Sequence, residues 1–265
     1  FNVFAQSPAD SRGYITEAIT VYCEVLSKKQ VEQTYIKILG MLNNALPQLP
    51  TTGRSEPPNP AAPPPPAHTM IDLLVLLVPH LAAEQSTQLF DLALGESLLG
   101  NKDAGVQKKT YRLLTRLVDG KMASTVLASK APAHGTRLGL LLHQIGESTE
   151  AVVAGAKRDR IALLAALVPK IPPTELHFLP SIIPEAVLGT KEANQAARQS
   201  SYDLLVQMGE KMKAGGQVKA HLINGDVDED MEDAAPANIK DASLQEYVTM
   251  VAAGLAGATL PILQI

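Results

Sequence analysis

The sequence predicts an all-α protein made of stacked helical repeats, and three observations support this fold class. One stretch occurs twice: LLVLLVPHL at Leu73–Leu81 returns as LLAALVPKI at Leu163–Ile171, and YRLL at Tyr111–Leu114 returns as YDLL at Tyr202–Leu205. Apolar residues recur at helical spacing within both copies. Hydrophobic residues make up 46% of the chain and aromatics only 4%, which suits close packing of helices. A period of about 90 residues is twice one HEAT or armadillo unit, so we predict an α-solenoid of such repeats.

Two helices are predicted in residues 1–49, as an N-terminal helical hairpin of the solenoid. The first, over 11–26, begins at Ser11 as N-cap and places apolar residues three and four apart: Ile15, Ala18, Ile19, Tyr22 and Leu26. The second, over 28–46, carries a stripe of Val31, Tyr35, Ile38, Leu39 and Leu42. Cys23 is expected to be a small core residue rather than a nucleophile.

Residues 50–68 are predicted to form a Pro-rich linker. Seven prolines lie between residues 57 and 66, and proline lacks the amide donor that a helix interior requires. The segment is interpreted as an extended surface connector. A docking site for a partner that recognises proline motifs remains the alternative.

Residues 69–213 are predicted to hold the HEAT-like repeats. In the first copy we expect helices near 69–82, 85–99 and 103–119, and the third should bury Val106, Thr110, Leu113, Leu114 and Leu117. Helices near 121–130, 136–146, 149–169 and 174–188 should follow. A long helix over 191–212 should turn Ala197, Tyr202, Leu205 and Met208 inward.

An acidic flexible loop is predicted over residues 214–240, followed by a further solenoid helix within 241–265. Asp226, Asp228 and Asp230 alternate as at the start of a calcium-binding loop. However, Met231 stands where the turn needs glycine, and Ala237 where the bidentate glutamate belongs. A solvated loop or a contact for a basic partner is therefore expected, and no calcium site.

Composition limits the classes of function. The net charge of −4 excludes a globally basic nucleic-acid binder, so such binding needs a local patch. A single cysteine forms no internal disulfide and no zinc cluster, and the longest apolar run is too short for a membrane span. Nothing in the sequence matches a catalytic or phosphate-binding motif. We therefore expect no enzyme activity, cofactor, metal or small-molecule substrate.

Basic residues supply the candidate binding site. Lys108, Arg112 and Arg116 lie four apart on one predicted helix, opposite its apolar stripe, and Lys102 and Lys109 flank them. A second basic group comprises Lys157, Arg158 and Arg160. Such stripes can track phosphates, and without interleaved aromatics the contact should be to the backbone of RNA rather than to its bases. A merely solvated face is the alternative interpretation.

Several strings of residues resemble the Rrp-twelve-like proteins, which are large HEAT-repeat factors of eukaryotic ribosome assembly. The strings are VQKKTYRLL at Val106–Leu114, LGTKEAN at Leu188–Asn194, YDLLVQMG at Tyr202–Gly209 and YVTMVAAGLAG at Tyr247–Gly257. The resemblance implies a non-catalytic scaffold in small-subunit ribosome biogenesis, within the 90S pre-ribosome and pre-40S particle.

The resemblance also implies partners and a cellular place. The partners would be pre-ribosomal RNA and ribosome-assembly proteins, with roles in rRNA processing and subunit export. The place would be the nucleus and nucleolus, with shuttling to the cytoplasm. The chain starts at Phe1 and is expected to be a segment of a longer protein. The alternative is a protein-only HEAT adaptor, either a nuclear transport receptor or a kinase or phosphatase scaffold.

Overall fold

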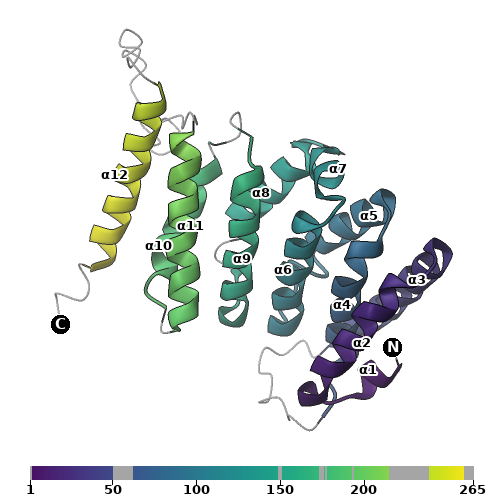
Figure 1. The fold of residues 1–265 in the computed structure, drawn as a ribbon. Coiled ribbons are helices and arrows are strands. Elements are labelled where there is room, and N and C mark those ends of the chain that lie inside the picture. Colours follow the sequence, from purple (N-terminus) through teal and green to yellow (C-terminus); the bar gives the residue numbers. More distant parts are fainter. Residues whose placement is uncertain are drawn as a thin grey trace. The chain divides into compact units, whose positions relative to one another are not determined.

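A computed structural model describes residues 2–49, 62–148, 151–172, 176, 178–192, 194–214 and 239–259. These residues are almost entirely helical, which confirms the predicted all-α class (Figure 1). Most of the predicted Pro-rich linker and of the predicted acidic loop lies outside the described residues. The chain divides into two compact units. Unit 1 comprises Phe1–Arg137 and Glu150–Leu163, and unit 2 comprises Leu138–Thr149 and Leu164–Ile265.

Unit 1 is built on a row of helices. Helix α3 packs on α4, and α4 packs on α6, while α5 and α7 lie against α6 and each other. The bounds are α1 Asn2–Gln6, α2 Arg12–Glu24, α3 Lys28–Ala45, α4 Pro66–Leu77, α5 Ala83–Leu94, α6 Ala104–Asp119 and α7 Ala123–Ala128. Short 3₁₀ helices occupy Ala9–Ser11, Leu46–Gln48, Val78–His80 and Ala154–Ala156.

Helix α6 supplies the centre of the unit 1 core. Its predicted stripe is confirmed, because Val106, Thr110, Leu113, Leu114 and Leu117 are all buried. The Asp103 side chain accepts from the Val106 amide and so caps the first turn. The helix ends at Gly120, as a glycine after the last periodic residue indicates.

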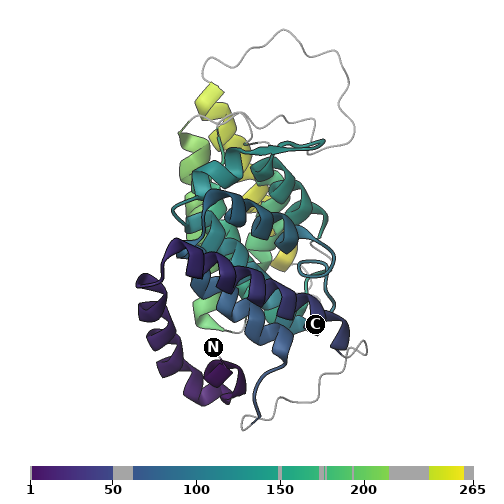
Figure 2. The same ribbon diagram turned by 90° about the vertical axis from the view of Figure 1, so that its right-hand side faces the viewer.

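Helix α2 departs from the predicted packing. It lies against α4, and Figure 2 shows that it diverges from α3 after the short turn that joins them. Ile19 and Cys23 are buried as expected, but Tyr22 is 52% exposed and Ala18 is exposed as well. The buried side also carries Arg12, whose guanidinium donates to Thr69 on α4. Ser11 precedes the helix, but its side chain makes no capping bond.

A two-stranded hairpin follows α7, with β1 at Lys130–Ala131 paired antiparallel to β2 at Gly135–Thr136. Sequence reasoning missed it. Ala133 and Gly135 both adopt positive φ, which closes so tight a turn. Arg137 fixes the hairpin to α5 through two hydrogen bonds of 2.7 Å to Asp91.

Unit 2 contains α10 (Leu179–Gly189), α11 (Gln195–Lys213) and α12 (Ile239–Thr259), which pack on one another. Its other elements are α8 (Arg137–Glu147) and the 3₁₀ helix Val168–Lys170; the boundary between the units falls inside α9 (Lys157–Leu167). Tyr247 of α12 donates its hydroxyl to the Leu205 carbonyl, and burial raises the pKa of Tyr247 to about 12. Its ring would touch a Cβ at Gly209 at 3.1 Å, so the glycine lets α12 approach α11.

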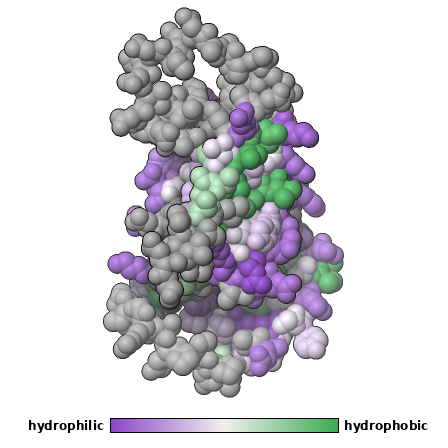
Figure 3. Space-filling model, turned by 90° about the vertical axis from the view of Figure 1, so that its left-hand side faces the viewer, coloured by the Kyte–Doolittle hydropathy of each residue, from purple (hydrophilic) through white to green (hydrophobic). Residues whose placement is uncertain are grey.

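The exposed side of α12 carries apolar residues next to the polar Gln245 and Thr249. Val248 is 55% exposed, and Ala252 and Ala256 are exposed too. Figure 3 shows apolar residues gathered on this face of unit 2. On α11, Leu205 and Met208 are buried as predicted, whereas Tyr202 is 50% exposed and the inward placement predicted for it is wrong.

The two sequence copies adopt matching local structures. Each opening helix ends in a 3₁₀ turn around a proline, at Val78–His80 and at Val168–Lys170. Each closing helix begins at a side-chain cap: Asp103 accepts from Val106 N, and Asn194 accepts from Ala197 N at 3.1 Å. The structural counterpart of Asp103 is therefore Asn194.

Candidate nucleic-acid interface

The predicted basic stripe lies on the solvent side of α6 in unit 1. Arg116 is exposed, Arg112 is about half exposed, and Lys108 is partly exposed, while Lys102 is exposed in the turn before the helix. Lys157 and Arg158 are exposed at the start of α9. Within the described residues, no hydrogen bond or ion pair engages Lys102, Lys108, Arg116, Lys157 or Arg158. We call these five residues and Arg112 the basic face.

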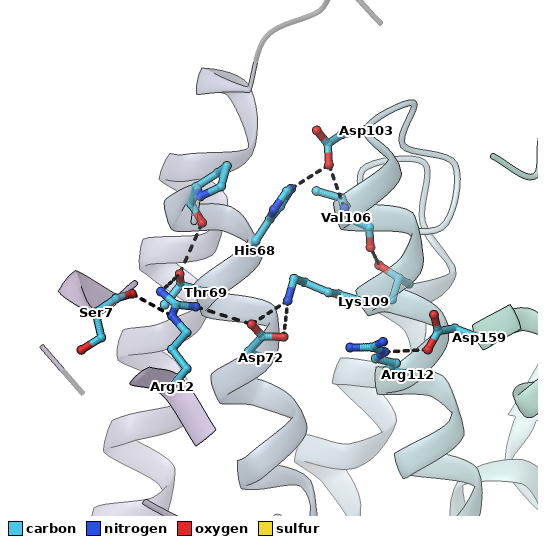
Figure 4. A network of polar contacts seen from close by, with 12 residues as sticks. Ser7, Arg12, His68, Thr69, Asp72, Asp103, Val106, Lys109, Arg112 and Asp159 are labelled. Carbon is cyan, nitrogen blue, oxygen red and sulfur yellow. Dashed lines mark hydrogen bonds and ion pairs between the residues drawn. The ribbon is translucent and has the colours of Figure 1, made fainter. Parts of the chain in front are cut away.

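The structure brings the start of α9 to α6. Arg112 Nε donates to Asp159 Oδ1 at 2.6 Å, which joins residues 47 positions apart (Figure 4). Lys157 and Arg158 immediately precede that aspartate, so the first turn of α9, which carries them, lies beside α6. Asp159 neutralises only part of this charge, and the terminal nitrogens of Arg112 remain available to a ligand.

Two predicted binding residues are engaged within the protein. Arg160 is only 1% exposed, and its Nη1 donates to the Tyr111 hydroxyl at 3.1 Å. A side chain so deeply buried cannot reach a phosphate, so we remove Arg160 from the candidate surface. Lys109 is also engaged within the protein, because its Nζ lies 2.6 Å from both carboxylate oxygens of Asp72.

Asp72 joins three helices of unit 1. Besides Lys109 of α6, it pairs with Arg12 of α2 at 3.7 Å. Arg12 also donates to Thr69 on α4 at 2.9 Å and to the Ser7 carbonyl at 3.1 Å, and its guanidinium lies 4.5 Å from the centre of the Phe4 ring. Burial lowers the pKa of Arg12, and the charge of Asp72 opposes that shift. This network holds the helices beneath the basic face (Figure 4).

Gln107 fixes the segment that leads into α9. Its Nε2 donates to the Ala151 carbonyl at 3.2 Å, and its Oε1 accepts from the Val153 amide at 2.8 Å. The side chain is 3% exposed. It therefore satisfies two backbone groups of the connection and sets where Lys157 and Arg158 emerge.

A capped helix start lies at the edge of the basic face. Asp103 Oδ1 is 2.7 Å from His68 Nε2 and also caps α6 through Val106 N. A Cβ at Gly105 would lie 2.2 Å from His68 Cε1, so glycine makes room for the imidazole. Burial works to raise the pKa of Asp103, but hydrogen bonds from Val106 N–H and His68, with the His68 charge, outweigh it and lower the pKa below 3.8.

Because the pKa of Asp103 is lowered, the stability of the protein should depend on pH in a way that can be tested. A carboxylate with a lowered folded-state pKa stabilises the fold above its unfolded pKa, and that contribution is lost as pH falls through the folded value. Asp103→Asn keeps a capping oxygen and removes the charge. We expect it to lower the free energy of unfolding by about 1 kcal/mol at pH 7, and the difference from wild type should shrink below about pH 3.8 in urea titrations.

The matched control is Asp119→Asn at the exposed C-terminal end of α6. It should change the free energy of unfolding little at either pH. A difference for Asp103→Asn that stayed constant from pH 7 to pH 3 would refute the electrostatic role of this cap.

Sequence reasoning missed four residues that hold the site together through long-range contacts: Asp72, Gln107, Asp159 and Tyr111. Asp72 carried a usable signal, since a carboxylate inside the apolar run from Ile71 to Leu77 needs a buried partner. No signal in the sequence indicated that Gln107 has a buried partner, because glutamine on a helix is usually a surface residue.

Among the described residues, no group of three His, Cys, Asp or Glu side chains is arranged to hold a metal ion. None of the described helices combines the length and apolar character needed to cross a bilayer. The described part of the site thus presents cations on a helical surface.

Sequence similarity to known proteins extends over nearly the whole chain. Ribosomal RNA-processing protein 12 of Saccharomyces cerevisiae is 27% identical over 259 residues, which is 97% of this chain and 20% of that protein. The chain thus has a homologue named ribosomal RNA-processing protein 12. The putative ribosomal RNA-processing protein 12 of Schizosaccharomyces pombe is 25% identical over 97% of the chain and 20% of that protein.

A human relative is named RRP12-like protein and is 30% identical over 141 residues, which is 53% of this chain and 10% of that protein. These findings confirm the resemblance drawn from the sequence. The chain spans about one fifth of the length of the two yeast relatives. No protein-family model matches the chain.

Proposed function

We propose that this chain is a non-catalytic part of an assembly factor for the small ribosomal subunit, which acts in rRNA processing within the 90S pre-ribosome and pre-40S particle. The observation that carries the proposal is similarity over 97% of the chain to a protein named for ribosomal RNA processing. The place of action is the nucleolus and nucleus, with shuttling that accompanies subunit export. The partners are pre-ribosomal RNA and assembly proteins.

The architecture proposed for this role is a HEAT-like solenoid spanning residues 69–213. The support is internal: both sequence copies share the proline-containing 3₁₀ turn and the side-chain cap described above. In such an array each repeat contacts its neighbours, and the long outer surface serves as the binding site. A scaffold of this kind needs no pocket.

Within unit 1 the basic face is the proposed RNA contact. Its cations are Lys102, Lys108, Arg112, Arg116, Lys157 and Arg158. Cations on a helix surface bind phosphates and release counterions, and this contact is independent of base sequence. Lys109 and Arg160 stay out of it because Asp72 and Tyr111 hold them.

The test is the salt dependence of binding to a structured fragment of small-subunit ribosomal RNA. The variant Lys108→Glu/Arg116→Glu/Arg158→Glu leaves Arg112 and its pair with Asp159 intact. Three lost phosphate contacts should reduce the magnitude of the slope of log Kobs against log salt by about 2 to 3 and weaken binding throughout the titration.

The control variant is Lys28→Glu/Lys29→Glu/Lys37→Glu, which reverses three exposed lysines of α3 and changes the net charge equally. It should keep the wild-type slope. If both variants lose slope equally, the contact is not located on the basic face. If neither loses slope while the chain still co-sediments with pre-40S particles, the chain acts there through proteins alone.

A further inference from the structure

Helix α2 carries an apolar stripe that no described part of the chain covers. Tyr14 is 82% exposed, Val21 is 63% exposed and Val25, the C-terminal cap residue, is 75% exposed. Ala18 between them is exposed too. These four residues, the α2 stripe, are spaced four, three and four apart, as the a and d positions of a coiled-coil helix are.

The stripe lies opposite the side by which α2 is attached. Arg12, Ile19 and Cys23 form the buried side, with Arg12 bound to Thr69 and paired with Asp72. Since the packing of α2 on α4 uses only this side, the stripe does not serve the described fold. Isolated exposed apolar residues are ordinary, but four in helical register form a continuous seam.

The charge beside the stripe restricts what can cover it. Glu17 and Glu24 are seven residues apart at the flanking positions of the seam, and both are exposed. No hydrogen bond or ion pair from the described residues engages either carboxylate. Arg12 is the one basic residue of α2 and it is buried, so the exposed charge of the helix is wholly acidic.

We propose that the α2 stripe docks an amphipathic helix of a partner protein whose apolar seam is flanked by lysine or arginine. Flanking charges of opposite sign select the partner in such pairings. A second copy of α2 in antiparallel register brings Glu17 and Glu24 against their like, and nucleic acid or an anionic membrane meets the same repulsion. The contact is separate from the basic face and stands even if the RNA contact fails.

The test uses a synthetic three-heptad peptide with leucine at a and d and lysine at the positions that face Glu17 and Glu24. A twin peptide carries glutamate in place of lysine. Fluorescence anisotropy measures the affinity of each peptide for the whole chain. The lysine peptide should bind at least about fivefold more tightly than its twin, and Val21→Ser/Val25→Ser should weaken it about tenfold.

The charge swap decides whether the site is specific. Glu17→Lys/Glu24→Lys should invert the preference in favour of the glutamate peptide. Glu32→Lys/Glu96→Lys makes the same change of net charge at exposed carboxylates of α3 and of the turn after α5, and should keep the wild-type preference. All of these positions are exposed, so the free energy of unfolding should stay within about 0.5 kcal/mol of wild type.

Three results would overturn the proposal. The first is equal affinity for the two peptides, or a preference that the charge swap leaves unchanged. The second is a dimer of the chain in sedimentation equilibrium that Val21→Ser/Val25→Ser dissociates, because a second copy then covers the stripe. The third is binding of the chain to phosphatidylserine vesicles that is lost in the same variant.

Discussion

Asp72→Ala should destabilise unit 1 by about 3 kcal/mol, because it leaves two cations without their counterion. Arg12 and Lys109 have side chains that are 9% and 18% exposed, so solvent cannot replace the lost carboxylate well. The three residues come from α2, α4 and α6, and the loss should loosen all three helices together. The measurement is the free energy of unfolding from urea titration.

A double variant separates charge from packing. Asp72→Leu/Lys109→Met removes the closest pair and keeps apolar volume, so it should recover part of the loss, while Arg12 still lacks its counterion. Asp119→Ala, at an exposed carboxylate on α6, serves as the control and should change stability by less than about 0.5 kcal/mol. A loss below about 1 kcal/mol for Asp72→Ala would show that the network contributes little.

Gln107→Ala should cost about 3 kcal/mol and release the start of α9. The substitution leaves the Val153 amide and the Ala151 carbonyl without partners in a part-buried site, and it opens a cavity beside α6. Since this segment leads into Lys157 and Asp159, the pair of Arg112 with Asp159 should loosen as well. Hydrogen exchange should then show faster exchange at Val153.

Gln107→Met is the matched variant, because it keeps the length and volume of the side chain and removes its hydrogen bonds. It should show the faster exchange at Val153 with a smaller loss of stability, about 2 kcal/mol. Unchanged protection of Val153 in both variants would mean that Gln107 does not hold the segment.

Much of the helical pattern could be predicted from the sequence. The stripe of Val106, Thr110, Leu113, Leu114 and Leu117 is buried as its spacing predicted, because a strongly amphipathic helix has one way to hide its apolar side. The α2 prediction was less accurate, since apolar residues there occupy more than one side. The packing of Arg12, Ile19 and Cys23 in the tertiary structure selected which side became buried.

The candidate site was predicted in part. The four-residue spacing of Lys108, Arg112 and Arg116 placed them on one side of α6, because the helical period alone determines that. Lys109, their neighbour in sequence, pairs with Asp72 instead, and Arg160 donates a hydrogen bond to the Tyr111 hydroxyl. Both partners are distant in sequence, so no local pattern indicated them.

By itself the sequence determined the all-α class, the duplicated block and the placing of cations along α6, because all three follow from periodicity along the chain. Tertiary structure alone decided which cations stay free, which side of α2 is left uncovered, and that Tyr111 is buried while its counterpart Tyr202 is exposed. The physical reason is that the helical period fixes the direction in which each side chain points away from the axis of its helix. Burial and charge pairing depend on what the neighbouring helix presents there.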